Sequence, residues 1–168
     1  MLRKVMIKDT QKSLEKVAVL LREETTLSLA TANLDGAAWI TPLFYISDND
    51  LSLYWLSSDR SQHSINLVRQ PRAAATVYRD VSSWKEIRGL QMRGSAVKVT
   101  APKLRSRLID AYCKRFKLGR AMRLAARQSA LYRFEPEFFR YIDNARGFGH
   151  KFELTLQPEG WDLSGLPA

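Results

Sequence analysis

Polar and basic side chains that could hold a phosphate group cluster in one short stretch of the sequence. An apolar run, Leu53–Leu56, ends in Ser57-Ser58-Asp59-Arg60-Ser61, and His63 follows two residues later. The next residues place Ile65 and Val68 on one side of a short helical pattern. This order predicts a strand, a polar turn and a helix with an apolar face.

The start of this helix is the predicted phosphate site. The first N–H groups of a helix have no partner within it and carry a partial positive charge, so they attract anions. The candidate side chains for the phosphate are Arg60, Ser61 and His63, and Ser57 and Ser58 at the strand end could reach the ring edge or the connecting chain of the ligand. The simpler alternative is that Asp59 or Ser61 caps the helix, while Arg60 and His63 are only solvated.

Two further pairs of residues are candidates for contacting a ligand's ring. Thr41 precedes Pro42 in a predicted strand, and because proline cannot donate a hydrogen bond, the sheet has an edge or gap there. Backbone groups beside Thr41 and Pro42 are then free for a ligand. Gln91 and Arg93 alternate with Met92 and so share one face of their strand. An ordinary edge strand and a solvated sheet face are the alternatives.

The turn from Asn144 to Lys151 is the last candidate. Gly147 and Gly149 allow the backbone to approach a ligand closely, and Lys151 adds a positive charge beside them. The spacing is not that of a dinucleotide-binding loop, so an ordinary loop is the alternative.

The sequence lacks the residue patterns of metal sites, disulfides and common nucleophilic or phosphate-binding motifs. The sequence has two His, His63 and His150, and one Cys, Cys113, without a carboxylate cluster, which argues against a metal site and excludes an internal disulfide. Cys113 lies in a helical pattern and is expected in the core. No nucleophile-elbow or phosphate-loop motif occurs.

Length and composition predict one domain without a membrane span. A chain of 168 residues with 45% hydrophobic residues can bury a core. We expect a single domain over residues 1–156 and a loose C-terminal tail over 157–168. No apolar run approaches the ~20 residues of a membrane helix. The N-terminal residues lack the apolar core of a secretory signal. Because a lone cysteine also fits a reducing compartment, we expect a cytoplasmic protein.

Positive charge is concentrated in the segment 101–130. The formal net charge is +10, and this segment contributes +8, since nine Lys and Arg stand against one acidic residue, Asp110. The basic residues are Lys103, Arg105, Arg107, Lys114, Arg115, Lys117, Arg120, Arg123 and Arg127. Such a block predicts an anionic partner and leaves phosphate compounds, nucleic acid and acidic lipid open.

The remaining patterns predict an antiparallel barrel with helices at its side. Asp35-Gly36 marks a hairpin turn, because glycine tolerates the positive φ of tight turns. The alternation of apolar residues changes phase across Gly94, which predicts a bulge. A helix opens at Pro102 and ends near Gly119, and the first helix is capped by Asp9 or Thr10. Strands are expected over 27–33, 38–47, 53–56, 73–78, 90–100, 131–134, 138–143 and 150–156.

Several segments occur in an order that is typical of one family. They are Leu27–Asn33, Leu34-Asp35-Gly36 and Ala38–Ile46, then Leu51–Ser58, Arg60–Leu67 and Gln70–Ala73, then Ile87–Gly94, Tyr141–Asn144 and Gly147–Lys151. In this order they resemble the FMN-binding split barrels, the pyridoxamine 5'-phosphate oxidase-like superfamily, over residues 14–156. The resemblance implies a mainly β fold, an antiparallel split β-barrel with flanking helices. It also implies a homodimer with FMN at the interface.

The functional expectation follows the resemblance with one departure. Pyridoxamine phosphate oxidases proper end in an Arg-Leu-His-Asp-Arg type segment that holds substrate, and nothing between Phe152 and Ala168 matches it. We therefore expect an FMN-binding oxidoreductase for a small molecule, with its phosphate on Arg60, Ser61 and His63. The alternatives are a non-catalytic flavin-binding module and a nucleic-acid or anionic-surface binding protein. Heme or a deazaflavin in place of FMN also stays open.

Overall fold

The computed structural model describes residues 2–157 and 160–161, with side chains from Thr10 onward. Its strands are β1 (Thr26–Ala32), β2 (Ala38–Phe44), β3 (Ile46–Ser47), β4 (Leu53–Ser57), β5 (Arg72–Tyr78), β6 (Arg88–Lys98), β7 (Ala130–Asp143) and β8 (Lys151–Thr155). The α-helices are α1 (Leu2–Glu23), α2 (Gln62–Arg69), α3 (Pro102–Arg115) and α4 (Arg120–Gln128), and η1 (Trp84–Glu86) and η2 (Asn144–Arg146) are short 3-10 turns.

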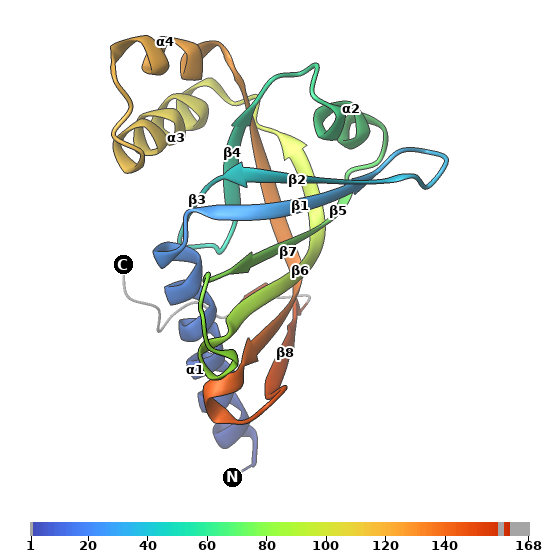
Figure 1. The fold of residues 1–168 in the computed structure, drawn as a ribbon, viewed down its shortest axis with the longest axis vertical. Coiled ribbons are helices and arrows are strands. Elements are labelled where there is room, and N and C mark those ends of the chain that lie inside the picture. Colours follow the sequence, from blue (N-terminus) through green and yellow to red (C-terminus); the bar gives the residue numbers. More distant parts are fainter. Residues whose placement is uncertain (1, 158–159, 162–168) are drawn as a thin grey trace.

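The strands form one antiparallel sheet that curls into a split barrel (Figure 1). Helix α2 and the hairpin of α3 and α4 lie at one end of the long strands β6 and β7, and α1 lies toward the other end. The predicted fold class, a mainly β antiparallel split barrel with flanking helices, is confirmed.

Strands β2 and β3 form the two ends of the sheet, whose order is β2-β1-β5-β6-β7-β4-β3. Pro42 of β2 lies opposite Ser28 of β1, and no strand of the described part pairs with the other edge of β2, so the predicted edge is confirmed. The chain turns from β2 into β3 at buried Tyr45, whose hydroxyl donates to the Leu21 carbonyl of α1 at 2.9 Å. Because β2 also approaches β4 and α2, the split of the barrel lies beside α2.

Strands β6 and β7 form a long ladder that changes register once. The shift lies between Arg93 and Gly94, so the predicted bulge is confirmed. A Cβ atom on Gly94 would lie 2.0 Å from the Glu135 carbonyl oxygen, which only glycine avoids. The predicted break of the following strand at residues 135–137 is wrong, because the bulge accommodates Pro136 opposite Gly94 and β7 continues to Asp143.

Helix α1 and the turn after α3 differ from the predicted helix ends. Helix α1 begins at Leu2, ahead of the expected cap, and buries Leu14, Val17, Ala18 and Leu21 against the sheet. In the α3–α4 turn, Lys117 takes a positive φ of 50°, whereas Gly119 caps the start of α4 with a φ of −70°. Cys113 is buried with Ile109 and Ala126, as expected for a core residue.

The described part of the chain contains no helix long and apolar enough to cross a membrane. Nor do its residues place three or more His, Cys, Asp or Glu together as metal ligands. Of the predicted tail, Gln157, Gly160 and Trp161 are described, and the Trp161 ring packs 5.1 Å from that of Phe139. The rest of that segment lies outside the described residues.

Candidate cofactor-binding site

Three polar side chains meet where β4 ends and α2 begins. The Ser57 hydroxyl lies 2.8 Å from His63 Nε2 and 3.0 Å from the Ser61 hydroxyl, which is itself 3.1 Å from the same nitrogen. The Ser61 hydroxyl also lies 2.8 Å from the Ser58 carbonyl and 2.8 Å from the Ser64 hydroxyl. The structure therefore brings Ser61 and His63 of the predicted phosphate site into contact with Ser57, which was expected to reach another part of the ligand, and His63 is buried.

Helix α2 turns its polar side toward the barrel and its apolar side outward. Ile65 and Val68 are 44% and 83% exposed, so the expected apolar face does not pack within this chain. The buried residues are His63, Ser64, Asn66 and Leu67. The Asn66 amide donates to the Thr31 hydroxyl of β1 at 3.1 Å and accepts from Gln62 at 2.9 Å. Polar groups that are paired in this way can be buried, and this reverses the expected orientation.

The first turn of α2 offers unpaired backbone donors. Ser61 is the N-cap residue, but its hydroxyl makes no capping bond to the helix. The N–H groups of Gln62, His63 and Ser64 have no acceptor among the described residues. Such groups, at the positive end of the helix dipole, stabilise a bound anion.

The outer side of the turn carries Ser58, Asp59 and Arg60, all of them exposed. The Asp59 carboxylate contacts the Lys98 ammonium at 2.7 Å and the Tyr132 hydroxyl at 3.0 Å, and these bonds lower the pKa of Asp59. Capping of the helix by the side chain of Asp59 or Ser61 is therefore wrong, because neither side chain bonds to an N–H group of the first turn. The Arg60 side chain has no partner among the described residues, which leaves its guanidinium available for a ligand's phosphate.

Thr41 of β2 lies on the inner side of the sheet, beside the split. It pairs with buried Leu29, and its hydroxyl is buried without a hydrogen-bond partner among the described residues. Thr31, which Asn66 of α2 contacts, lies on the same side of the hairpin. Pro42 alternates to the exposed side. An unpaired buried hydroxyl is costly, so the inner side of β2 fits a polar ligand.

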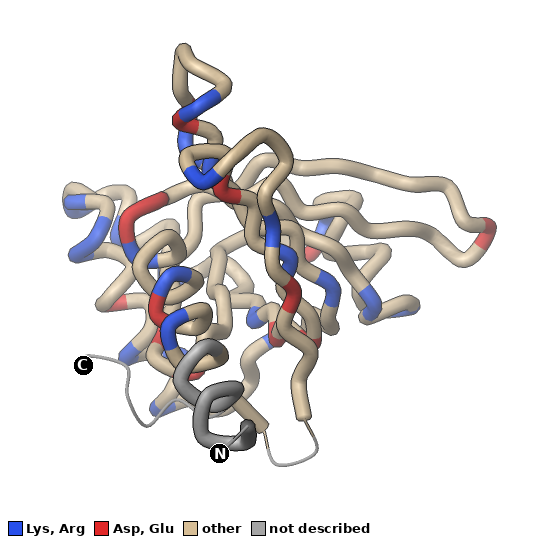
Figure 2. Tube along the Cα trace, turned by 90° about the horizontal axis from the view of Figure 1, so that it is seen from below, with Lys and Arg blue, Asp and Glu red and all other residues tan. Residues whose placement is uncertain are grey.

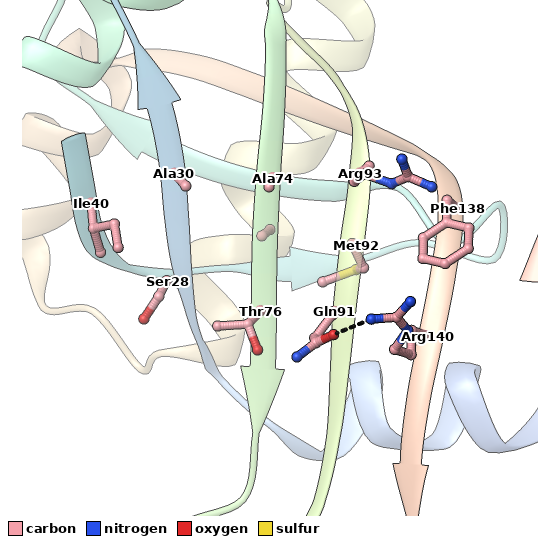
Figure 3. Close-up of a pocket in the computed structure, with 11 residues that line it drawn as sticks. Ser28, Ala30, Ile40, Ala74, Thr76, Gln91, Met92, Arg93, Phe138 and Arg140 are labelled. Atoms are coloured by element: carbon pink, nitrogen blue, oxygen red, sulfur yellow. Dashed lines mark hydrogen bonds between the residues drawn. The ribbon is translucent and has the colours of Figure 1, made fainter. Parts of the chain in front are cut away.

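Gln91 and Arg93 line a groove of about 510 Å³ on the outer face of the sheet (Figure 3). Its floor is made of small side chains from β1 and β5, which are Ser28, Ala30, Ala74 and Thr76. The Arg93 guanidinium carbon lies 4.3 Å from the centre of the Phe138 ring, and Arg140 reaches within 3.5 Å of the Gln91 amide oxygen. A flat floor bordered by two arginines suits a planar, negatively charged ligand.

Sequence reasoning named Gln91 and Arg93 and missed the other residues that line this groove, Thr76, Phe138 and Arg140 among them. Thr76, Gln91 and Arg140 are cross-strand neighbours in one row, and Arg93 and Phe138 pair in the next. The alternation of residues 138–143 was a usable signal, since it places Phe138 and Arg140 on one face of their strand. Which strand lies beside β6 is decided only by the sheet topology.

The loop that contains Asn144 lies at the far end of β6 from the α2 turn. The Asn144 amide is buried, donates to the Trp84 carbonyl at 2.9 Å and accepts from the Gly149 N–H at 3.0 Å, so it holds the loop together. Lys151 is exposed at the start of β8. The 11 residues of β6 lie between this loop and the α2 turn, a contour length of at most about 35 Å at ~3.3 Å per residue. The loop and the turn therefore lie at opposite ends of β6.

Burial lowers the pKa of His63, so its ring is neutral at pH 7. In a neutral imidazole one nitrogen donates and the other accepts, and here Nε2 is shared with the hydroxyls of Ser57 and Ser61. An anion bound at this cluster would favour the protonated ring and raise that pKa.

A family model described as pyridoxamine 5'-phosphate oxidase matches residues 13–143. The chain belongs to this family. The matched region includes the α2 turn, the strands of the groove and the hairpin of α3 and α4. It ends before Asn144 and Lys151, so the family match does not extend to the last two predicted site residues.

Relatives and solved structures agree with this membership. A UPF0306 protein of Serratia proteamaculans strain 568 is 27% identical over 150 residues, which cover 88% of this chain and 98% of the relative. ChuZ of Campylobacter jejuni aligns with 94% of this chain and 65% of its own, at a TM-score of 0.73 and 17% identity. HutZ, the heme storage protein of Vibrio cholerae, aligns with 73% of this chain and 88% of its own, at a TM-score of 0.63 and 20% identity. The TM-scores show a shared fold, and the family match confirms the expected membership of the pyridoxamine 5'-phosphate oxidase-like split barrels.

Proposed function

We propose that this protein binds FMN at the start of α2, within a homodimer, and acts as an oxidoreductase on a small molecule. The observation that carries the proposal is the cluster of Ser57, Ser61 and His63 beside unpaired N–H groups. A bound flavin supplies the redox chemistry of its ring, while the protein binds and orients it.

The α2 turn provides enough donors for a phosphate group. Three backbone N–H groups, the imidazole and the serine hydroxyls converge there, and the free guanidinium of Arg60 can join them from the outer side. The nearest carboxylate, Asp59, is already neutralised by Lys98. Phosphate therefore meets donors at this turn without an unpaired negative charge beside them.

The apolar side of α2 supports a second copy of the chain at this site. Val68 and Ile65 of α2 are both exposed. Exposed apolar side chains gathered beside a site are typical of protein interfaces. A second copy would cover them, and the Lys151 loop, which lies at the far end of β6 in its own chain, could reach the cofactor from that copy.

The groove on the outer face of the sheet could hold the flavin ring or the substrate. Arg93 would stabilise the anionic reduced ring, and Gln91 would hydrogen-bond to its polar edge. Oxidation of a nicotinamide donor by the FMN-loaded protein tests the oxidoreductase activity. The expected result is turnover by wild type and slower turnover by Arg93→Gln. If the FMN-loaded protein oxidised no donor, only the flavin-binding part of the proposal would stand.

The phosphate site is tested by comparing FMN with riboflavin, which lacks the phosphate. We expect wild type to bind about one FMN per chain. Arg60→Ala should weaken FMN about tenfold to a hundredfold, since a hydrogen bond to a charged group contributes roughly 1.5–3 kcal/mol. Riboflavin affinity should change little. Arg69→Ala, which removes another exposed cation at the opposite end of α2, is the matched control and should leave both affinities unchanged.

Two outcomes would contradict the phosphate site. Equal losses for FMN and riboflavin would show that Arg60 supports the fold or the ring. If Arg69→Ala weakened FMN binding as much as Arg60→Ala, the loss would reflect the overall positive charge of the protein and not a specific contact of Arg60 with the phosphate.

Heme is the second candidate cofactor, because the fold is shared with the heme storage protein HutZ. His150 could hold the heme iron, since it is only half-buried and its ring has no hydrogen-bond partner among the described residues. The absorption spectrum after addition of each cofactor separates the two proposals. A Soret band that His150→Ala abolishes would favour heme over FMN.

A further inference from the structure

The hairpin of α3 and α4 presents a basic surface that the cofactor site does not use. We propose that this surface binds the phosphodiester backbone of nucleic acid without reading its base sequence. Among the described residues of the hairpin, five cations have neither an ion pair nor a hydrogen bond to their side chains. They are Lys103, Arg107, Lys114, Lys117 and Arg120, and Figure 2 marks the charged positions along the chain.

Three of the cations on α3 lie along one exposed side of the helix. Lys103, Arg107 and Lys114 are spaced at i, i+4 and i+11, which places them within about 40° of one another around the helix. The opposite side of α3 is buried through Leu108 and Tyr112. The helix therefore has one basic side that packing in this chain leaves open.

The arginines of α4 extend this basic side into one continuous surface. Arg120, Arg123 and Arg127 are spaced at i, i+3 and i+7 and line an open groove of about 610 Å³. Arg127 Nη2 lies 3.1 Å from Asp110 Oδ1, and Asp110 shares the basic side of α3 with Arg107 and Lys114. This ion pair places the two basic helix sides next to each other.

The hairpin is held in place by arginines whose charge stays uncompensated. Arg105 donates to the carbonyls of Arg127 and Ser129 at 2.7 Å each, and Arg123 donates to the Leu118 carbonyl at 2.8 Å. A carbonyl fixes a guanidinium but does not neutralise it. These arginines therefore stabilise the hairpin and still contribute to the positive potential of its surface.

The arrangement favours nucleic acid over a membrane surface. Among the described residues 101–130, Met122 and Leu124 are the exposed large apolar side chains, and they lie two positions apart, about 200° around α4. A helix that lies in a bilayer interface turns its apolar side to the lipid. The apolar side of α4 instead faces α3, where Ala126 is buried with Ile109 and Cys113. The same segment exposes no aromatic ring for base stacking, so backbone contacts without sequence preference are expected.

Two charge-matched variants test this surface. The first, K103Q/R107Q/K114Q/R120Q, removes cations of the basic surface. The control, K12Q/R69Q/K85Q/R146Q, removes four exposed cations elsewhere, and both lower the formal net charge from +10 to +6. Binding to labelled duplex DNA and single-stranded RNA is measured by fluorescence anisotropy between 50 and 200 mM salt. FMN binding and thermal unfolding report whether each variant folds like wild type.

We expect wild type to bind both nucleic acids with a steep salt dependence. If each of the four side chains neutralises one phosphate, the first variant should reduce the slope of log K against log salt by about 3.6 for duplex DNA. The control should keep the wild-type slope. Equal losses in both variants would overturn the proposal, because net charge alone would then explain binding. Binding to phosphatidylserine vesicles but to neither nucleic acid would also overturn it.

Discussion

Helices α2 and α4 are nearly equal in length, yet they use their polar residues in opposite ways. Helix α2 buries His63, Ser64 and Asn66 and exposes Ile65 and Val68. Helix α4 buries Ala126 and exposes its arginines. The buried polar groups of α2 are fixed in place by hydrogen bonds, which suits a site that must bind one ligand in one geometry. The exposed charges of α4 suit a partner that is recognised by charge alone.

The largest expected difference between the two helices is in stability. Leu67→Ala in α2 removes a side chain that is 5% exposed and packed in the main core, and should cost about 2–4 kcal/mol. Leu124→Ala in α4 changes a residue that is 61% exposed and should stay within about 0.5 kcal/mol. Urea unfolding of both variants measures this. Similar losses would mean that α4 is packed as firmly as α2.

A smaller effect should follow from the buried amide of α2. Asn66→Ala removes the bonds to Thr31 and Gln62 and leaves the buried Thr31 hydroxyl unpaired, at a cost of about 1–3 kcal/mol. Gln128→Ala, at an exposed polar residue of α4, serves as the control and should be near neutral. If Asn66→Ala were as mild as Gln128→Ala in urea unfolding, the amide would not be what orients α2.

The exposed apolar side of α2 should matter for self-association. Val68→Asp should weaken the homodimer at least about tenfold, equivalent to ~1.4 kcal/mol, because it places a charge in the proposed interface. Leu124→Asp introduces the same charge on α4 and should leave the dimer intact. Sedimentation equilibrium of the two variants decides between them, and a dimer insensitive to Val68→Asp would place the interface elsewhere.

The smallest expected effect concerns the pH dependence from His63. Burial lowers its pKa in the folded protein below the ordinary value of 6.5, so the folded state binds fewer protons than the unfolded state. Its contribution to stability is therefore complete above pH 6.5 and is lost as the pH falls from there through the folded pKa. Urea unfolding at several pH values should show this acid loss in wild type and a reduced loss in His63→Gln. Identical pH profiles would show that other groups control acid stability.

Local patterns in the sequence determined much of the fold. The polar turn between strand and helix, the Asp35-Gly36 hairpin turn and the bulge at Gly94 all follow from the conformations that a few adjacent residues allow. The positive charge of residues 101–130 is likewise a property of composition. Ser57, Ser61 and His63 could be predicted to meet because a strand end and a helix start lie within seven residues of each other.

Tertiary structure alone decided which faces and distances matter. Asn66 finds Thr31 on a strand 35 positions earlier in the sequence, and this long-range bond rotates α2 so that its apolar side faces outward. Strand order brings Phe138 and Arg140 beside Arg93 and Gln91, and the length of β6 separates Lys151 from the α2 turn. These relations depend on pairing between distant segments, which local periodicity does not encode. The physical reason is that burial and hydrogen bonding across the sheet outweigh the preference of a short helix for burying its own apolar side.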